Sequence, residues 1–130
     1  MRSTVTLSLI ALLGLAATAC AEPPAIDARA ASELVQKKQA VLVDVRESDE
    51  VAEGMAAPAQ WLPLSRIQGD GKALSDFLSR QAKGTTLIFY CAGGGRAESV
   101  AQLAASKGFK VANMGGFRSW VKAGLPTKKP

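Results

Sequence analysis

Three short apolar segments constrain the fold of this chain more than any other feature. They cover residues 41–45, 85–90 and 110–114, and the first is β-branched and apolar on both faces. Such segments are typical of buried strands in a parallel sheet. Helical patterns separate them, and the length of 130 residues suits one domain. The alternation predicts an α/β fold with a central parallel β-sheet flanked by helices on both faces.

Helical spacing of apolar residues predicts the segments between the strands. Asp27 is a suitable N-cap for a first helix ending near residue 38, and Ser48 for a short helix ending at Gly54. Trp61 begins a second extended piece at 61–64. Further helices are expected between residues 74 and 84, 97 and 108, and 116 and 124.

Ligands of open parallel sheets bind beyond the carboxyl ends of the strands. Asp44 lies near the end of one predicted strand, Cys91 directly follows another, and Asn113 lies at the end of a third. We therefore expect these three segments to converge on one edge of the sheet.

The segment after Cys91 joins a buried strand to a helix through a glycine-rich loop. Glycines let successive backbone N–H groups turn toward one point, and a helix N-terminus adds partial positive charge there. A guanidinium at the end of the loop adds forked donors suited to oxyanions. A cysteine in such a loop should have a lowered pKa and react as a thiolate, although an ordinary turn with an incidental cysteine stays open. The predicted anion-binding loop consists of Ala92, Gly93, Gly94, Gly95 and Arg96.

Composition excludes several kinds of site. The chain has no histidine and two cysteines, which removes Ser-His and Cys-His catalysis and imidazole or Cys-rich metal sites. We therefore expect neither a metal nor a cofactor. The net charge of +5 comes from scattered Lys and Arg, a distribution that does not predict nucleic-acid binding.

The N-terminal 21 residues have the layout of a secretory signal, with Arg2 followed by an apolar run and small residues. A membrane anchor is the alternative, but the apolar run is short for a span. The residues before Cys20 also resemble a lipobox, so Cys20 is a possible lipidation site. The prediction is export to the periplasm, with membrane attachment only if Cys20 is lipidated. Residues 22–25 are expected to form a short tether and 127–130 a tail around a domain at 26–126.

The chain resembles the rhodanese-like domain family, and three motifs carry the resemblance. Residues 91–96 fit its Cys-x-x-Gly-x-Arg active loop, residues 43–46 read Val-Asp-Val-Arg with Glu50 following, and residues 115–126 fit its closing Gly-Gly segment. The resemblance runs from about 26 to 126. The signal segment and the length are similar to those of small exported rhodaneses of the phage-shock type.

The resemblance implies a thiosulfate sulfurtransferase without a cofactor. Cys91 would take sulfur from a small anionic donor such as thiosulfate and pass it from a persulfide to cyanide or a thiol. Arg96 would steer the donor, and the protein is expected to be a monomer. Asp44 and Arg46 are supporting candidates, although a structural ion pair or hydrogen bond is the preferred interpretation because charges at a buried strand end need partners.

The chain departs from the family pattern at Met55, Ala57 and Ala59, and again in the loop at Ala92. Met55 stands where the family usually has a histidine, and Ala92 makes the loop less cationic than versions with Arg or Lys. Two alternatives remain. A Cys-based phosphatase would have a similar fold with a loop one residue longer, and a non-catalytic or sulfur-carrier binding module would share the whole fold.

Overall fold

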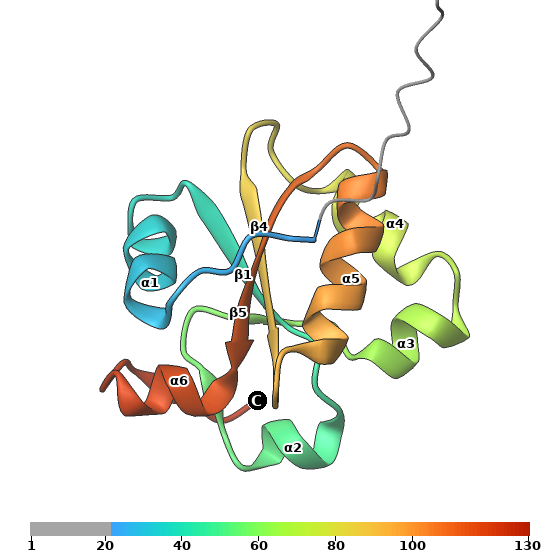
Figure 1. Cartoon of the computed structure of the whole chain (residues 1–130). Helices are drawn as coiled ribbons and strands as arrows, with labels where there is room; N and C mark the ends of the chain where they lie inside the picture. The colour runs from blue at the N-terminus through green and yellow to red at the C-terminus, as the bar shows by residue number, and fades with distance from the viewer. Residues whose placement is uncertain (1–21) are drawn as a thin grey trace, which may run out of the picture.

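The computed structural model describes residues 22–130 (Figure 1). The predicted signal segment and Cys20 lie outside the described residues. The helices are α1 Ala28–Gln36, α2 Ser48–Ala52, α3 Leu64–Gly69, α4 Ala73–Ser79, α5 Gly95–Ser106 and α6 Phe117–Lys122. The strands are β1 Ala40–Asp44, β2 Met55–Ala56, β3 Gln60–Trp61, β4 Thr86–Cys91, β5 Lys110–Gly116 and β6 Thr127–Lys128.

The central sheet has the strand order β3-β1-β4-β5, and all its neighbours are parallel. The short strands β2 and β6 form a separate antiparallel pair. Parallel neighbours require crossover connections, which the intervening helices supply. The carboxyl ends of β1, β4 and β5 therefore meet at one edge of the sheet.

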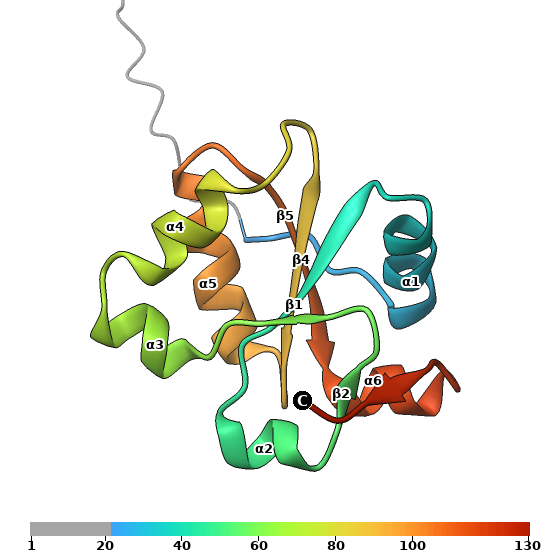
Figure 2. The ribbon, with the colours of Figure 1, turned by 180° about the vertical axis from the view of Figure 1, so that it is seen from behind.

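Helices cover both faces of the sheet, which confirms the predicted fold class. In Figures 1 and 2, α3, α4 and α5 lie on one side of the strands and α1 on the other. Alternate residues of each strand point to opposite faces. Phe89 packs in the cluster shared with α4 and α5, whereas Tyr90 packs in the cluster shared with α1 and α6.

The segment between β1 and β4 differs most from the sequence prediction. Helix α3 was not expected, because Ile67 is its one buried residue and leaves little periodicity to detect. The predicted extended piece at 61–64 is divided, since β3 ends at Trp61 and Leu64 begins α3. The N-cap of α2 is Glu47, where Ser48 was expected; Glu47 and Glu50 form a reciprocal capping box.

Both ends of the described chain join the fold. Asn113 accepts a backbone hydrogen bond from Ile26 at 3.0 Å and donates one to Pro24 at 2.9 Å. Residues of β6, which lie in the predicted tail, pair with β2. The predicted tether and tail therefore take part in the folded unit. None of the helices within residues 22–130 is long and apolar enough to cross a membrane.

Candidate active site

Cys91 is the last residue of β4 and lies at the carboxyl edge of the sheet. It is in register with Gly116 of β5, and its neighbour Tyr90 is in register with Asp44 of β1. Asn113 of β5 also reaches this edge, because its side chain donates to the carbonyl of Gly94 at 3.1 Å. The expected convergence of the three segments is present in the structure.

The thiol of Cys91 lies beneath the start of α5. Its Sγ accepts a hydrogen bond from the Gly94 N–H at 2.9 Å. Gly94 is the N-cap of α5 and has a φ of 103°, a left-handed conformation that favours glycine. Cys91 is 1% exposed, whereas the loop residues Ala92 and Gly93 are exposed. The sulfur therefore lies just below a cover of small residues.

Two opposing effects act on the pKa of the Cys91 thiol. Burial raises it, because a low-dielectric environment disfavours the charged form. Hydrogen bonds from backbone N–H groups favour the thiolate and outweigh burial, so the pKa lies below the usual value for cysteine. The N–H groups with this effect belong to Ala97, Gly94, Gly93 and Arg96. The set of N–H donors therefore includes that of Ala97, which lies one residue beyond the predicted loop.

The end of β5 supports the loop from the side. A Cβ atom on Gly116 would lie 2.3 Å from the carbonyl oxygen of Ala92, a separation that real atoms do not reach. Glycine at 116 therefore lets two backbones come into direct contact. The side chain of Asn113 accepts from the Gly115 N–H at 2.8 Å while it donates to Gly94. The loop is thus attached to β5 by close packing and by one amide side chain.

Arg96 pairs with a carboxylate from α2. Its Nη1 and Nη2 atoms donate to the two carboxylate oxygens of Glu50, each at 2.7 Å. Hydrogen bonds from Arg96 lower the pKa of Glu50 to about 2 and raise the pKa of Arg96. The two side chains are 28% and 30% exposed, so the pair lies at the surface of the site.

Asp44 and Arg46 form a buried ion pair below α2. Arg46 Nη2 donates to Asp44 Oδ2 at 2.7 Å, and the two side chains are 5% and 0% exposed. The same Nη2 donates to the Gly54 carbonyl at 2.7 Å. The guanidinium also lies 4.2 Å from the ring centre of Phe117. Arg46 therefore connects the end of β1 to α2 and α6.

Helix α2 has a second attachment through Glu47. The carboxylate of Glu47 accepts from the Ser65 backbone N–H at 3.0 Å and from its hydroxyl at 2.6 Å. The backbone N–H of Glu47 in turn donates to Glu50 at 2.9 Å. These bonds hold Glu50, and through it Arg96, against the start of α3.

The surroundings of Met55 and of the two tryptophans indicate mainly structural roles. Met55 is almost fully buried in the cluster around α1 and α6, so an apolar side chain fills the position where the family usually has histidine. Trp120 is fully buried in the same cluster. Trp61 is exposed, and its indole N–H donates to the Arg46 carbonyl at 2.9 Å.

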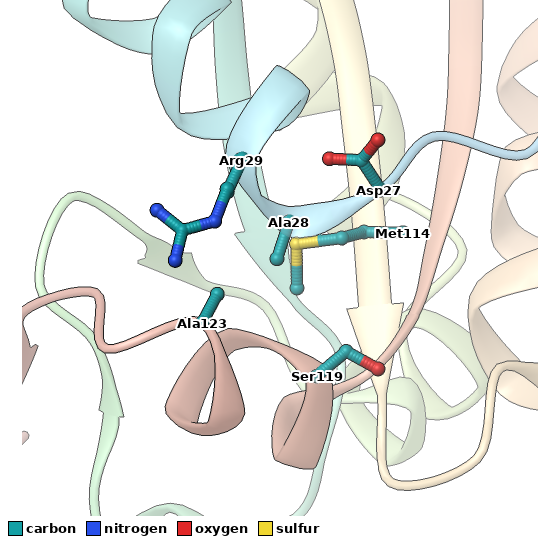
Figure 3. A pocket seen from close by; sticks show the side chains of 6 residues that line it. All are labelled: Asp27, Ala28, Arg29, Met114, Ser119 and Ala123. Carbon is teal, nitrogen blue, oxygen red and sulfur yellow. The ribbon is translucent and has the colours of Figure 1, made fainter.

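A surface pocket of about 360 Å³ lies between α1, β5 and α6 (Figure 3). Figure 3 shows Met114 in its centre, with Asp27 and Arg29 on opposite sides of it. The pocket contains neither Cys91 nor any residue of its loop. Among residues 22–130, no group of three or more potential metal ligands is present.

Sequence reasoning did not assign Glu50 or Asn113 to the site. Glu50 entered only as part of a motif, although an acidic residue after Val-Asp-Val-Arg is a signal for a partner to Arg96. Asn113 was placed at the correct edge, but its bond to Gly94 depends on the irregular register of β4 and β5 between Phe89 and Tyr90. Such a local shift has no pattern in a single sequence.

The chain is similar in sequence to a known family and to known proteins. The family model of the rhodanese-like domain matches residues 27–123. The chain is 34% identical over 97 residues to the thiosulfate sulfurtransferase GlpE of Coxiella burnetii, covering 73% of this chain and 83% of that protein. It is 30% identical over 108 residues to a sulfurtransferase of Allochromatium vinosum, covering 81% and 94%.

A solved structure extends the similarity to the backbone. A rhodanese-like domain protein from Staphylococcus aureus superposes with a TM-score of 0.62 at 26% identity, covering 81% of this chain and 98% of that chain.

Proposed function

The chain belongs to the rhodanese-like domain family, and on that premise we propose that it is a sulfurtransferase that carries sulfur on Cys91 as a persulfide. The observation that carries the proposal is the hydrogen bond from the Gly94 N–H to Cys91 Sγ at the start of α5. Backbone donors at a helix N-terminus stabilise an anionic sulfur without a histidine or a metal. The similarity to sulfurtransferases supports the same reaction.

The reaction has two displacement steps. The Cys91 thiolate attacks the outer sulfur of thiosulfate, the S–S bond breaks, and sulfite leaves with the electron pair of that bond. The persulfide anion on Cys91 then gives its outer sulfur to an acceptor. With cyanide as acceptor, thiocyanate forms and the Cys91 thiolate returns; a thiol acceptor becomes a persulfide in the same way.

The N–H groups around Sγ suit both states of the cysteine. They favour the thiolate in the free enzyme, because they lower the pKa of Cys91. After the first step the negative charge moves to the outer sulfur, and the same helix N-terminus stabilises it. The site therefore needs no rearrangement of charged side chains between the two steps.

Phosphatase chemistry and simple binding fit the site less well. Four residues lie between Cys91 and Arg96, and this loop is shorter than that of the related phosphatases, where it must encircle a phosphate group. A binding module without catalysis would not need a thiol with a lowered pKa. Both observations favour sulfur transfer.

Intact mass spectrometry tests the proposal. Incubation with thiosulfate should add the mass of one sulfur atom to the wild-type protein, and cyanide should remove it. Cys91→Ser should gain nothing, because a hydroxyl does not displace sulfite under these conditions. A wild-type protein that gains no sulfur from thiosulfate or from an organic persulfide would contradict the proposal.

We further propose that the protein acts in the periplasm after removal of residues 1–21, or as a lipoprotein attached through Cys20. The charge and apolar pattern of the N-terminal segment support export. The mass of the protein purified from a bacterial host that secretes it would give the cleavage point. Retention of Met1 in that protein would contradict export.

A further inference from the structure

Arg96 and Glu50 lie on the rim of the Cys91 site, and their opposite charges nearly cancel. Arg96 is the one cationic side chain of the loop, and both of its terminal nitrogens donate to Glu50. A guanidinium bound at both edges by a carboxylate acts as a neutral unit, so its attraction for another anion is weak. The other side chain of the loop, Ala92, carries no charge.

The helix beside this pair is acidic. Glu47, Asp49 and Glu53 accompany Glu50 within residues 47–53, and Asp49 and Glu53 are exposed. Besides Arg96, two cations contact this segment: Arg46 Nη1 donates to the Glu50 carbonyl at 3.4 Å, and Lys129 Nζ donates to the Ala52 carbonyl at 3.1 Å. Arg46 is itself paired with Asp44, and Lys129 offsets only part of the acidic charge, so an excess of negative charge remains on this side of the site.

We propose that Glu50 determines donor specificity: by engaging Arg96, it leaves a site that binds the donor through backbone N–H groups and favours a sulfane donor of low charge, an organic persulfide, over dianionic thiosulfate. This inference rests on the proposed sulfur transfer. In the favoured reaction, the Cys91 thiolate attacks the terminal sulfur of R–S–SH, the S–S bond breaks, and R–S⁻ leaves. Cys91–S–SH forms, and the total charge stays at −1.

Burial of the cysteine supports the same preference. Cys91 is 1% exposed, so a donor reaches it with its terminal sulfur while the rest of the donor stays outside. For thiosulfate, the part outside is a sulfonate group beside Glu50 and the acidic face of α2. For an organic persulfide, the corresponding part is uncharged carbon.

Alkylation of Cys91 measures the charge at the sulfur without any sulfur transfer. Iodoacetate and iodoacetamide have similar shapes but differ by one negative charge. Their rate ratio at Cys91 therefore reports local electrostatics and cancels changes in thiolate content. Glu50→Gln should raise the iodoacetate to iodoacetamide ratio about fivefold, because it removes one negative charge from the rim of the site at intermediate dielectric.

The matched control is Asp49→Asn, which removes an exposed negative charge from the same helix one residue away. It should change the ratio by less than about twofold, because exposed charges are screened by salt. Arg96→Gln should lower the ratio, since it leaves Glu50 unpaired. The double variant Glu50→Gln with Arg96→Gln should return close to the wild-type ratio.

The double variant gives a second measurement in case a single variant fails to fold. Circular dichroism checks that each protein is folded. If the double variant has the low ratio of Arg96→Gln, Arg96 attracts anions by itself and the inference is wrong. An unchanged ratio in folded Glu50→Gln would lead to the same conclusion.

Steady-state kinetics with two donors completes the test. The wild-type kcat/KM should be higher for an uncharged-chain alkyl persulfide than for thiosulfate. Glu50→Gln should narrow this difference mainly by lowering KM for thiosulfate, with kcat little changed. If the ratio of kcat/KM for the two donors is the same in the wild-type protein and in Glu50→Gln, the inference is wrong. Absence of transfer from both donors would instead overturn the proposed function, and the alkylation ratios would still decide whether Glu50 controls the charge at Cys91.

Discussion

Within residues 22–130, two arginine–carboxylate pairs lie close to one another, and they are built differently. The Arg46–Asp44 pair is buried, with side chains 5% and 0% exposed, and it also binds the Gly54 carbonyl. The Arg96–Glu50 pair has about 30% of each side chain exposed and lies beside a loop made largely of glycine. We refer to the first as the anchor pair and to the second as the rim pair.

This difference teaches how the fold separates stability from chemistry. A buried pair is expensive to break, because one charge is left without a partner in a low-dielectric interior. A half-exposed pair contributes little to stability, because water and salt screen it. The anchor pair should therefore control whether the site forms, and the rim pair should control which molecules the formed site accepts.

Asp44→Asn should produce the largest loss of stability. The Asp44 carboxylate accepts from the Arg46 backbone N–H at 2.9 Å and from Nε and Nη2 of its side chain. An amide at this position leaves the buried guanidinium unpaired, which destabilises proteins by about 3–5 kcal/mol. Urea unfolding measures the loss.

The control for this prediction is Asp76→Asn, which breaks the exposed Lys72–Asp76 pair of α4. An exposed pair of this kind contributes about 0.3–0.5 kcal/mol. If Asp44→Asn and Asp76→Asn lower the free energy of unfolding equally, the distinction between buried and exposed pairs does not hold in this protein.

Gly116→Ala should affect the loop more than the rest of the fold. The added methyl would meet the Ala92 carbonyl oxygen at 2.3 Å, so the backbone after Cys91 must move. Overpacking of this kind destabilises by about 1–3 kcal/mol, and displacing a catalytic loop by about 1 Å reduces rates by roughly 100-fold.

Gly69→Ala is the corresponding control, because a Cβ there has no neighbour within 4 Å. It should leave sulfur transfer and the alkylation rate of Cys91 unchanged. Wild-type rates in Gly116→Ala would show that the loop tolerates displacement and would weaken the proposed role of its backbone donors.

Much of this architecture could be predicted from the sequence, because the strands of the central sheet are nearly all apolar. Leu42 and Ile88, for example, are fully buried and lie in short apolar segments that are typical of buried strands. The position of Cys91 followed from the order of strand, glycines and helix. The predicted N-cap Asp27 was also correct, since its side chain accepts from the Ala30 N–H at 2.9 Å.

The partners of the site could not be predicted in the same way. Contacts such as Arg96 to Glu50 join residues 46 positions apart, and local spacing carries no information about them. Helix α3 escaped prediction because a short helix with one buried side chain has almost no period. Local patterns therefore indicated where the cysteine lies, whereas its electrostatic surroundings depend on tertiary packing.

Asn113→Ala tests the connection between β5 and the loop. It removes the bonds to Gly94 and Gly115, and each such bond contributes about 1 kcal/mol. The free energy of unfolding should fall by about 1–2 kcal/mol, and the midpoint of the pH profile of Cys91 alkylation should rise, because Gly94 is less well placed to donate. Asn113→Asp keeps the acceptor for Gly115 but loses the donor to Gly94 and adds a negative charge that disfavours the thiolate, so its midpoint should shift in the same direction and further. An unshifted midpoint in both variants would show that Gly94 holds its position without this amide.

Glu50→Gln should have the smallest effect on stability, and its pH dependence identifies the cause. Pairing lowers the pKa of Glu50 to about 2 in the folded protein, from a usual value of 4.5. A carboxyl with a depressed folded pKa adds stability that is full above the unfolded pKa and is lost as pH falls through the folded pKa. Exposure of the rim pair limits this contribution to about 1 kcal/mol.

Wild-type protein and Glu50→Gln should therefore differ by about 1 kcal/mol in the free energy of unfolding at pH 6, and the difference should shrink between about pH 4.5 and 2. Urea titrations across this range measure it, with Asp49→Asn as the control for general charge effects. A difference of 3 kcal/mol or more at pH 6, which would match a buried pair, would place the rim pair in the same class as the anchor pair. The selectivity assigned to Glu50 would then be difficult to separate from a loss of folding, because the same substitution would disturb both.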